Sequence, residues 1–183
     1  MRLFIAIPLS PAVLAELSTV VARLRSSSDG LRWMAPESWH ITLQFLGNTD
    51  PDKYNCLVSR LGEVRSAPVP VHLTQLGFFD RAGIFYADVR LTAEIVALAE
   101  RITLATAVCG FVPEVRPFHP HITLARAKEQ GRGQPLRILE RRILRQPSFT
   151  RFVAPEFLLY ESHPSADGAS YEIRCRFPLH THA

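Results

Sequence analysis

Two histidines and two threonines recur in a tetrapeptide that occurs twice in the chain. The copies are His40-Ile41-Thr42-Leu43 and His121-Ile122-Thr123-Leu124, which lie 81 residues apart in a sequence of 183 residues. At average residue frequencies, one H-x-T-L is expected in about one of fifty chains of this length, and two copies in about one of a few thousand. The repeat therefore indicates a functional duplication and not a coincidence.

Each copy has the polarity pattern of a strand with one chemical face. Residues two apart in a strand point to the same side, so His40 and Thr42 share one face while Ile41 and Leu43 share the other. An imidazole moves a proton near neutral pH, and a threonine hydroxyl donates to an anionic oxygen. If the copies face each other, one histidine can activate an entering oxygen while the other protonates a leaving oxygen. Two hydroxyls would hold the non-bridging oxygens, so the pattern suits in-line displacement at phosphorus.

Structural interpretations of these four residues stay open beside the catalytic one. A hydrogen-bonded core position is the usual place for a lone histidine, but the duplicated context favours catalysis for His40 and His121. Thr42 and Thr123 are also good strand formers.

One further pattern near the second copy could bind a metal ion. His119 and His121 form an H-x-H pair, a spacing compatible with metal ligation. The residue at the matching place before His40 is Ser38, and the sequence shows no obvious carboxylate partner for His119. We therefore expect no metal at this site.

The elements that must position the motifs alternate along the chain. Strands are predicted around both motifs and in most other apolar runs, and four helices are predicted between them. Ser10-Pro11, Asp50-Pro51 and Thr92 have the residue types of helix starts. No Gly-rich strand-to-helix turn of a dinucleotide or P-loop fold is present. The predicted strands are 3–8, 39–46, 69–79, 83–89, 121–125, 157–160 and 171–177 with a short one at 152, and the predicted helices begin at 10, 50, 92 and 135. This order predicts an α+β fold with mainly antiparallel sheets.

The composition bounds the class of protein without defining its task. Apolar residues make up 47% and charged residues 21%, as in a folded globular domain. No apolar run approaches the roughly 18 residues that cross a bilayer, and the N-terminal apolar run is shorter than a secretory signal needs. We therefore expect one intracellular, cytoplasmic domain over residues 1–183, with no membrane contact.

The charge is compatible with a polyanionic partner but does not identify one. The formal net charge is +4, which concerns association and not fold. Six arginines fall within 20 positions, and they form either a solvated helical face or a phosphate-binding surface. These residues are Arg132, Arg137, Arg141, Arg142, Arg145 and Arg151.

The cysteines give no sign of a covalent framework. Cys56, Cys109 and Cys175 are far apart and form no C-x-x-C pair. An odd, unclustered set argues against disulfides and against a zinc site, and it suits a reducing cytosol. We expect all three to be small buried apolar residues.

The paired motif resembles the 2H phosphoesterase superfamily, which is defined by two H-x-[TS]-x motifs on pseudo-symmetric lobes. The flanking segments resemble the bacterial and archaeal RNA 2′,3′-cyclic phosphodiesterases, a group also called 2′-5′ RNA ligases. These segments are RLFIAI (2–7), WMAPESWHITLQFLG (33–47), RPFHPHITLAR (116–126), LYES (159–162) and YE (171–172).

The resemblance implies a fold, a substrate and a reaction. The expected fold is a single bilobal, pseudo-twofold domain of two interleaved lobes, each with one HxTL motif and a mainly antiparallel sheet flanked by helices. The active site would lie in the groove between the lobes. The reaction would open a 2′,3′-cyclic phosphate at an RNA end and leave a 2′-phosphomonoester, in a monomer, without metal or cofactor. The alternatives are an RNA-end binding protein with little turnover, and a related enzyme that acts on another phosphodiester or on 2′-5′ linkages.

The resemblance also assigns roles to residues of this chain. His40 and His121 match the catalytic histidines, and Thr42 and Thr123 match the phosphate-binding hydroxyls. We assign His40 as general acid to the leaving 3′ oxygen and His121 as general base on water, although a near-twofold site allows either direction. Arg126 matches an arginine that pairs with phosphate. Strict alternation puts Arg126 on the face opposite His121, so a bulge or a strand end is needed.

Aromatic residues offer platforms for a base. The counterpart of Arg126 in the first copy is Phe45, which we expect in the core, with base stacking as the alternative. Phe118, immediately before the second motif, is the first stacking candidate to test, and the other candidates are Trp33, Trp39 and Tyr86.

Overall fold

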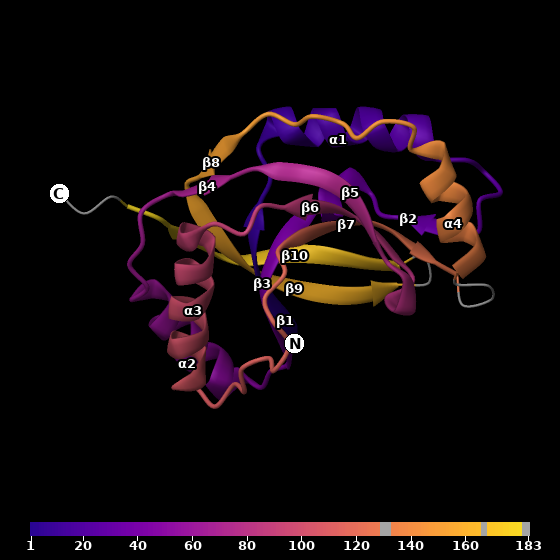
Figure 1. The fold of residues 1–183 in the computed structure, drawn as a ribbon. Helices are drawn as coiled ribbons and strands as arrows, with labels where there is room; N and C mark the ends of the chain where they lie inside the picture. Colours follow the sequence, from indigo (N-terminus) through magenta and orange to yellow (C-terminus); the bar gives the residue numbers. More distant parts are fainter. Residues whose placement is uncertain (129–132, 166–167, 181–183) are drawn as a thin grey trace.

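A computed structural model of the chain describes residues 1–128, 133–165 and 168–180 (Figure 1). The strands are β1 (Arg2–Pro8), β2 (Leu31–Trp33), β3 (His40–Asn48), β4 (Val69–Val71), β5 (Leu73–Phe79), β6 (Ile84–Val89), β7 (His121–Ala127), β8 (Phe152–Ala154), β9 (Glu156–Ser165) and β10 (Gly168–Pro178). The helices are α1 (Pro11–Leu24), α2 (Pro51–Gly62), α3 (Ala93–Ala107) and α4 (Gly133–Arg142), with short 3₁₀ turns η1 (Pro36–Ser38) and η2 (Asp80–Ala82).

The helix starts follow the local sequence. Ser10, Asp50 and Thr92 cap α1, α2 and α3, and each side-chain oxygen accepts a hydrogen bond from the backbone N–H three residues on. Pro11 and Pro51 occupy first-turn positions, where the missing N–H has no intrahelical partner to lose. All three predicted starts are confirmed.

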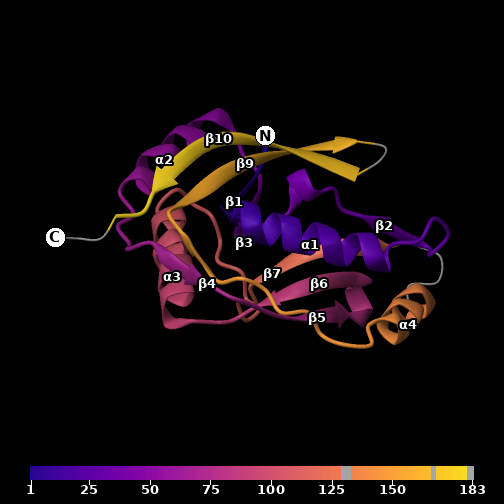
Figure 2. The same ribbon diagram turned by 90° about the horizontal axis from the view of Figure 1, so that it is seen from above.

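The strands form two four-stranded antiparallel sheets and one small two-stranded sheet. The strand orders are β10-β9-β1-β3, β2-β7-β6-β5 and β4-β8. The first large sheet combines strands from both ends of the chain, and the second combines strands from its middle. The predicted α+β class with mainly antiparallel sheets is confirmed. The motif strands β3 and β7 contact each other where the two large sheets meet, and α1 runs along the line between these sheets (Figures 1 and 2).

The motif residues that face inward anchor both strands in the core. Ile41 and Ile122 are fully buried, and Leu43 and Leu124 are 6% and 0% exposed. All four belong to one continuous apolar cluster that also includes residues of α1, α2 and α3. Burying these side chains fixes the register of each strand, because a one-residue slip would turn its apolar side chains outward.

A buried polar contact ties α3 to β3 directly after the first motif. Thr106 Oγ1 lies 3.0 Å from Gln44 Oε1 and 3.0 Å from the carbonyl oxygen of Thr103. One hydroxyl proton serves only one of these acceptors, and Gln44 Nε2 is buried without a partner among the described residues. Turning the Gln44 amide over gives both donors an acceptor, because Nε2 then donates to Thr106, which donates to Thr103.

The strand expected over residues 69–79 is two strands. β4 leaves the second sheet to pair with β8, while β5 continues along β6. Pro70 lies in β4, in a two-stranded ladder where an absent N–H costs little. No helix among the described residues is long and apolar enough to span a membrane.

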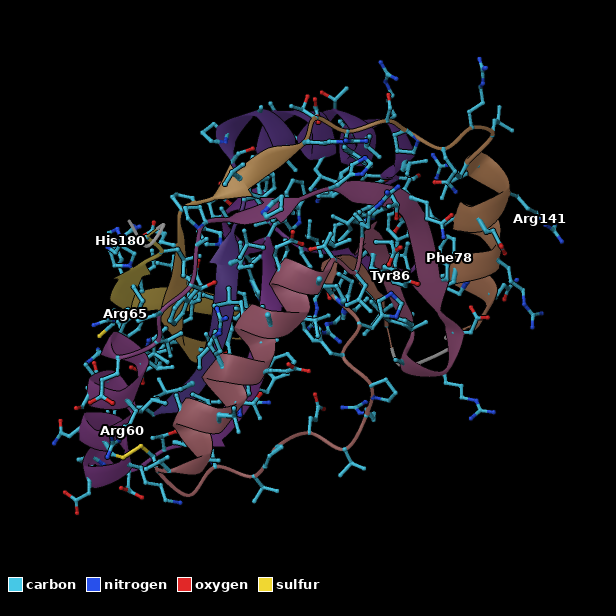
Figure 3. All side chains as sticks on the ribbon, turned by 60° about the vertical axis from the view of Figure 1, so that its left-hand side comes forward. Arg60, Arg65, Phe78, Tyr86, Arg141 and His180 are labelled. Atoms are coloured by element: carbon cyan, nitrogen blue, oxygen red, sulfur yellow. A yellow bond between two sulfur atoms is a disulfide. The ribbon has the colours of Figure 1, made fainter. Side chains whose placement is uncertain are left out.

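The expectation that no cysteine forms a disulfide is wrong. Cys56 in α2 and Cys109 after α3 form a disulfide, with Cα atoms 5.8 Å apart (Figure 3). Sequence spacing could not reveal this bond, because it depends on the side-by-side packing of two helices distant in the chain. Cys175 is free and partly buried. The cysteine pattern therefore no longer supports a reducing compartment, and the cytoplasmic location stays a prediction.

We predict that the disulfide contributes measurably to stability. A cross-link that closes a loop of 53 residues restricts the unfolded chain by about 4 kcal/mol in the chain-entropy model. Urea unfolding of the Cys56→Ser/Cys109→Ser variant should therefore show a lower midpoint than the oxidised protein. Cys175→Ser is the matched control and should change little. Equal midpoints for the double variant and a protein with a confirmed disulfide would contradict this.

Candidate active site

A β-bulge at the same place in each motif strand turns one further residue toward the histidine. Leu43 is an extra residue of β3 opposite β1, and Leu124 is an extra residue of β7 opposite β6. A second shift in the β1–β3 ladder, at Leu46, has no counterpart in the β6–β7 ladder. A bulge shifts the alternation of side chains by one position. Phe45 and Arg126, each five residues after a histidine, therefore line the same groove as the histidines. The prediction that a bulge or a strand end brings Arg126 to the same face as His121 is therefore confirmed, and the device is a bulge.

The groove between the sheets brings the two motifs together with Phe45, Phe118 and Arg126, but not with the stacking candidates Trp33, Trp39 and Tyr86. Its volume is about 1680 Å³, more than a single drug-sized ligand needs. The predicted site residues that line it are His40, Thr42, Phe45, Phe118, His121, Thr123 and Arg126. Its other charged lining residues are Arg2, Arg32, Asp80, Arg81, Asp88, Arg90, Glu114 and Arg116. The groove thus lies among more arginines than carboxylates, as suits an anionic ligand.

The arginine-rich stretch of the sequence does not supply this charge. Arg137, Arg141 and Arg142 are exposed on or at the end of α4, and Arg141 points outward from that helix (Figure 3). None of the three lines the groove. Arg145 and Arg151 are also exposed and lie beyond α4, and Arg132 lies outside the described residues. The described arginines of this stretch therefore form an exposed surface apart from the groove.

A backbone carbonyl orients each imidazole. His40 Nδ1 lies 2.7 Å from the carbonyl oxygen of Ser38, and His121 Nδ1 lies 2.8 Å from that of His119. A carbonyl accepts only, so Nδ1 carries the proton in the neutral ring. This tautomer leaves Nε2 of both rings free to accept or donate a proton.

His40 sits in an aromatic enclosure. Its ring centroid is 4.7 Å from Phe4, 5.2 Å from Tyr171 and 5.8 Å from Tyr160. Burial lowers the pKa of His40 to about 4, a hydrogen bond to the Ser38 carbonyl opposes the shift, and His121 adds to it. The imidazole is therefore neutral in the empty groove at pH 7.

His121 is less enclosed and stands among charged neighbours. Its ring lies edge-on to Phe79 at 5.1 Å and near Tyr86 at 5.4 Å. Burial lowers the pKa of His121, and the hydrogen bond to the His119 carbonyl opposes this shift. The charges of the His119 ring and of Arg126 lower the pKa further, and Asp88 raises it. Tyr86 fits here because Gly77 faces it across the β5–β6 ladder, where an added Cβ would lie 2.6 Å from the ring.

The hydroxyls of Thr42 and Thr123, and the guanidinium of Arg126 after the second motif, are available to a ligand. Among the described residues, Thr42 and Thr123 donate to no protein group, and Arg126 and Arg32 make no salt bridge. Arg126 faces Arg32 across the β2–β7 ladder. Burial and Arg32 lower the pKa of Arg126 while Tyr171 raises it. Two adjacent guanidiniums without a carboxylate are suited to bind a phosphate.

The aromatic predictions are partly wrong. Phe45 is 64% exposed in the groove and not in the core, because the bulge turns it outward. Trp39 is 4% exposed and belongs to the core. Trp33 packs on Phe85 and donates its indole N–H to Asp29. Neither tryptophan lines the groove.

Sequence reasoning missed the side chains that surround the two histidines. Asp88 Oδ1 lies 2.7 Å from His119 Nε2, so the expectation that His119 has no carboxylate partner is wrong. The aromatic rings of Phe4 and Tyr171 at His40 come from distant strands. No local sequence pattern indicates these neighbours. The carbonyls of Ser38 and His119 that orient the two rings are backbone groups, which any residue type supplies.

One group of described residues has the donor types and spacing of a metal site, and it lies outside the groove. Glu161, His163 and Glu172 bring their ligand atoms within 4.8 Å of one another. Arg174 reaches both carboxylates, at 3.5 and 3.3 Å, and His163 lies 3.1 Å from Glu172. These ion pairs already satisfy the group.

Two histidine–threonine motifs on contacting strands, facing one groove, define the class of two-histidine phosphoesterases. The chain belongs to the LigT like Phosphoesterase family, whose model matches residues 7–86 and 89–171. Each matched range contains one HxTL motif.

Relatives and solved structures agree with this family. The chain is 35% identical to an RNA 2′,3′-cyclic phosphodiesterase of Geobacillus stearothermophilus, over 96% of this chain and 56% of that protein. It is 29% identical to the Escherichia coli protein of the same name, over 88% of this chain and 86% of that one. A crystal structure of E. coli LigT complexed with 3′-AMP superposes with a TM-score of 0.81 and 28% identity, covering 97% of both chains. The chain thus spans about half the length of the Geobacillus relative and nearly all of the E. coli structure.

The low pKa of His40 predicts that acid destabilises the free protein. Between pH 6.5 and about 4 the unfolded chain binds a proton at this histidine that the folded protein does not. The free energy of unfolding should therefore fall as the pH drops through that window, by up to about 3 kcal/mol from this group. Urea titrations at pH 7.5 and 4.5 should show a smaller loss in His40→Gln than in the unsubstituted protein. His180→Gln, at an exposed histidine, is the control, and equal losses in all three proteins would refute the assignment.

Proposed function

We propose that this chain hydrolyses a 2′,3′-cyclic phosphate at an RNA end and leaves a 2′-phosphomonoester. The supporting observation is that two imidazoles line one basic groove together with two threonine hydroxyls. Among the described residues, neither Nε2 atom has a hydrogen-bond partner and neither hydroxyl donates to a protein group. The printed names of the relatives point to the same substrate.

The proposed reaction is an in-line displacement by water. His121 Nε2 accepts a proton as the water oxygen bonds to phosphorus, and the P–O3′ bond breaks on the opposite side. His40 Nε2 gives its proton to the leaving 3′ oxygen. Because His40 is neutral in the empty groove, it must gain this proton with the substrate. An adjacent anionic phosphate favours the charged form and shifts a pKa upward by about 1–3 units.

The remaining groove residues hold the anion. Thr42 and Thr123 donate to the non-bridging oxygens, where charge develops in the transition state, and Arg126 pairs with the same phosphate. Phe45, which is 64% exposed, and Phe118 offer apolar faces on which the bases of the RNA end stack. The proposed active form is a monomer in the cytoplasm, and the chemistry needs neither metal nor cofactor.

We predict that a 2′,3′-cyclic-ended oligonucleotide is converted to a 2′-phosphate in the presence of a chelator. Replacing either His40 or His121 by alanine should lower kcat by about 10²- to 10⁴-fold, because each removes one proton-transfer group. His163→Ala, at a histidine outside the groove, is the control. Chromatography of the labelled product distinguishes the 2′- from the 3′-phosphate. Full activity in both variants would sink the proposal, and a 3′-phosphate product would overturn the assigned leaving group.

The same assay separates the alternatives. Tight binding of the cyclic-ended RNA without product would favour an RNA-end binding protein. Faster turnover of 3′,5′-cyclic nucleotides or 2′-5′ dinucleotides would keep the mechanism and change the substrate.

A substrate with sulfur in place of the bridging 3′ oxygen should identify the acid. A thiolate leaves without protonation, so removal of the general acid costs little rate with this substrate. We expect His40→Ala to regain most of the activity that it loses on the oxygen substrate, whereas His121→Ala should stay slow. Recovery in His121→Ala alone would reverse the two roles.

A further inference from the structure

Three side chains outside the two motifs converge beside His121. His119 Nε2–H donates to Asp88 Oδ1 at 2.7 Å, and Thr74 Oγ1 donates to Asp88 Oδ2 at 2.8 Å. Thr74 lies on β5, Asp88 on β6 and His119 immediately before β7, and all three line the groove. Asp88 also faces His121 in the β6–β7 ladder.

His119 contacts His121 in two ways. Its carbonyl oxygen accepts the Nδ1–H bond of His121 at 2.8 Å. Its ring stands edge-on to the His121 ring, with centroids 5.9 Å apart. A shift of the His119 ring or backbone would therefore move the His121 imidazole, which we assign as the proton acceptor.

The first motif has no counterpart of this arrangement. Ser38 replaces His119 and supplies only the carbonyl, while its hydroxyl donates to the carbonyl of Ala35. Pro8 pairs with His40 in the β1–β3 ladder, where Asp88 pairs with His121 in the other sheet. The two lobes thus share the orienting carbonyl and differ in the carboxylate–imidazole pair.

The other groups that face His121 do not take over this task. Tyr86 on β6 and Phe79 on β5 present aromatic surfaces. Arg126 on β7 and His40 on β3 are the remaining titratable neighbours. Arg126 disfavours a positive charge on His121, and within the described part of the chain Asp88 is the carboxylate that favours it.

We propose that the Asp88–His119 pair, braced by Thr74, is a positioning device for His121 that marks the second motif as the proton-accepting side of the groove. The positioning role rests on the proposed hydrolysis. The Asp88–His119 pair itself rests only on the hydrogen bonds of the structure. His119 Nε2 is engaged by Asp88, so His119 acts through His121 and does not itself reach the reacting atoms.

The first test is a pair of matched amide substitutions. A glutamine amide can occupy the place of Nε2 and keep the bond to Asp88, whereas the shorter asparagine amide cannot. His119→Asn should lower kcat about tenfold or more with KM within about twofold, as loss of a partner that orients a functional histidine does. His119→Gln should restore most of kcat. Equal rates in the two variants would overturn the positioning role.

The second test reads His121 without any substrate. Nitrogen-15 chemical shifts of the imidazoles report the tautomer and the titration of each histidine in the free protein. His119→Gln removes a group that lowers the pKa of His121, so the His121 midpoint should rise. Adding Asp88→Asn to that variant removes the carboxylate alone and should lower the midpoint again. Asp80→Asn, at another groove carboxylate with no hydrogen bond to either histidine among the described residues, is the control.

These outcomes separate the inference from the proposed function. The protein could leave the cyclic phosphate intact while the His121 midpoint rises in His119→Gln and falls again on adding Asp88→Asn. The proposed function would then be wrong, and the coupling of the pair to His121 would be supported. If the protein is active but His121 titrates identically in all variants, the inference alone fails. In an active protein, the pH at which the rate falls on the acidic side should move upward in His119→Gln with the His121 midpoint.

Discussion

The backbone pairing of the two motif strands decides which side chains reach the groove. Directly after Thr42 and Thr123, each motif strand has an extra residue, Leu43 or Leu124, relative to its partner strand. The leucine stays buried while the residue five positions after the histidine turns outward, which brings Phe45 and Arg126 to the groove. Without these bulges the groove would lose Arg126, the arginine that we propose to pair with phosphate, to the opposite face. The proposed chemistry therefore depends on a bulge that both motif strands share.

Duplication alone gives two equivalent imidazoles, but a displacement at phosphorus needs one acid and one base. The difference must come from residues that the duplication does not repeat. Aromatic rings enclose His40 and exclude charge from its surroundings, whereas His121 stands beside the Asp88–His119 pair. In the proposed mechanism, the residues next to the motifs, and not the motifs themselves, therefore set the direction of proton transfer.

The sequence predicted the fold class, the starts of α1, α2 and α3, and six of the groove residues, because these depend on local patterns. Caps, strand alternation and a repeated tetrapeptide are all visible within a few positions. It failed for Phe45, whose exposure depends on ladder register, and for Cys56 and Cys109, whose bond depends on helix packing. It also missed Asp88, because a carboxylate more than 30 residues before His119 becomes its partner only through the pairing of β6 with β7.

Burial of the histidines also links catalysis to occupancy of the groove. In the free protein, burial holds the pKa of His40 near 4 and lowers that of His121. Both imidazoles are then neutral near pH 7, and the arginines supply the positive charge of the groove. In the proposed reaction, a cyclic phosphate would bring a negative charge that favours protonation of His40. After the P–O3′ bond breaks, the proton would have moved to the product and His121 would carry the charge instead. Departure of the phosphomonoester would remove the anion that supports this charge, so His121 would lose its proton to water. The same burial that makes the free histidines weak bases would therefore return the site to its starting state after each turnover.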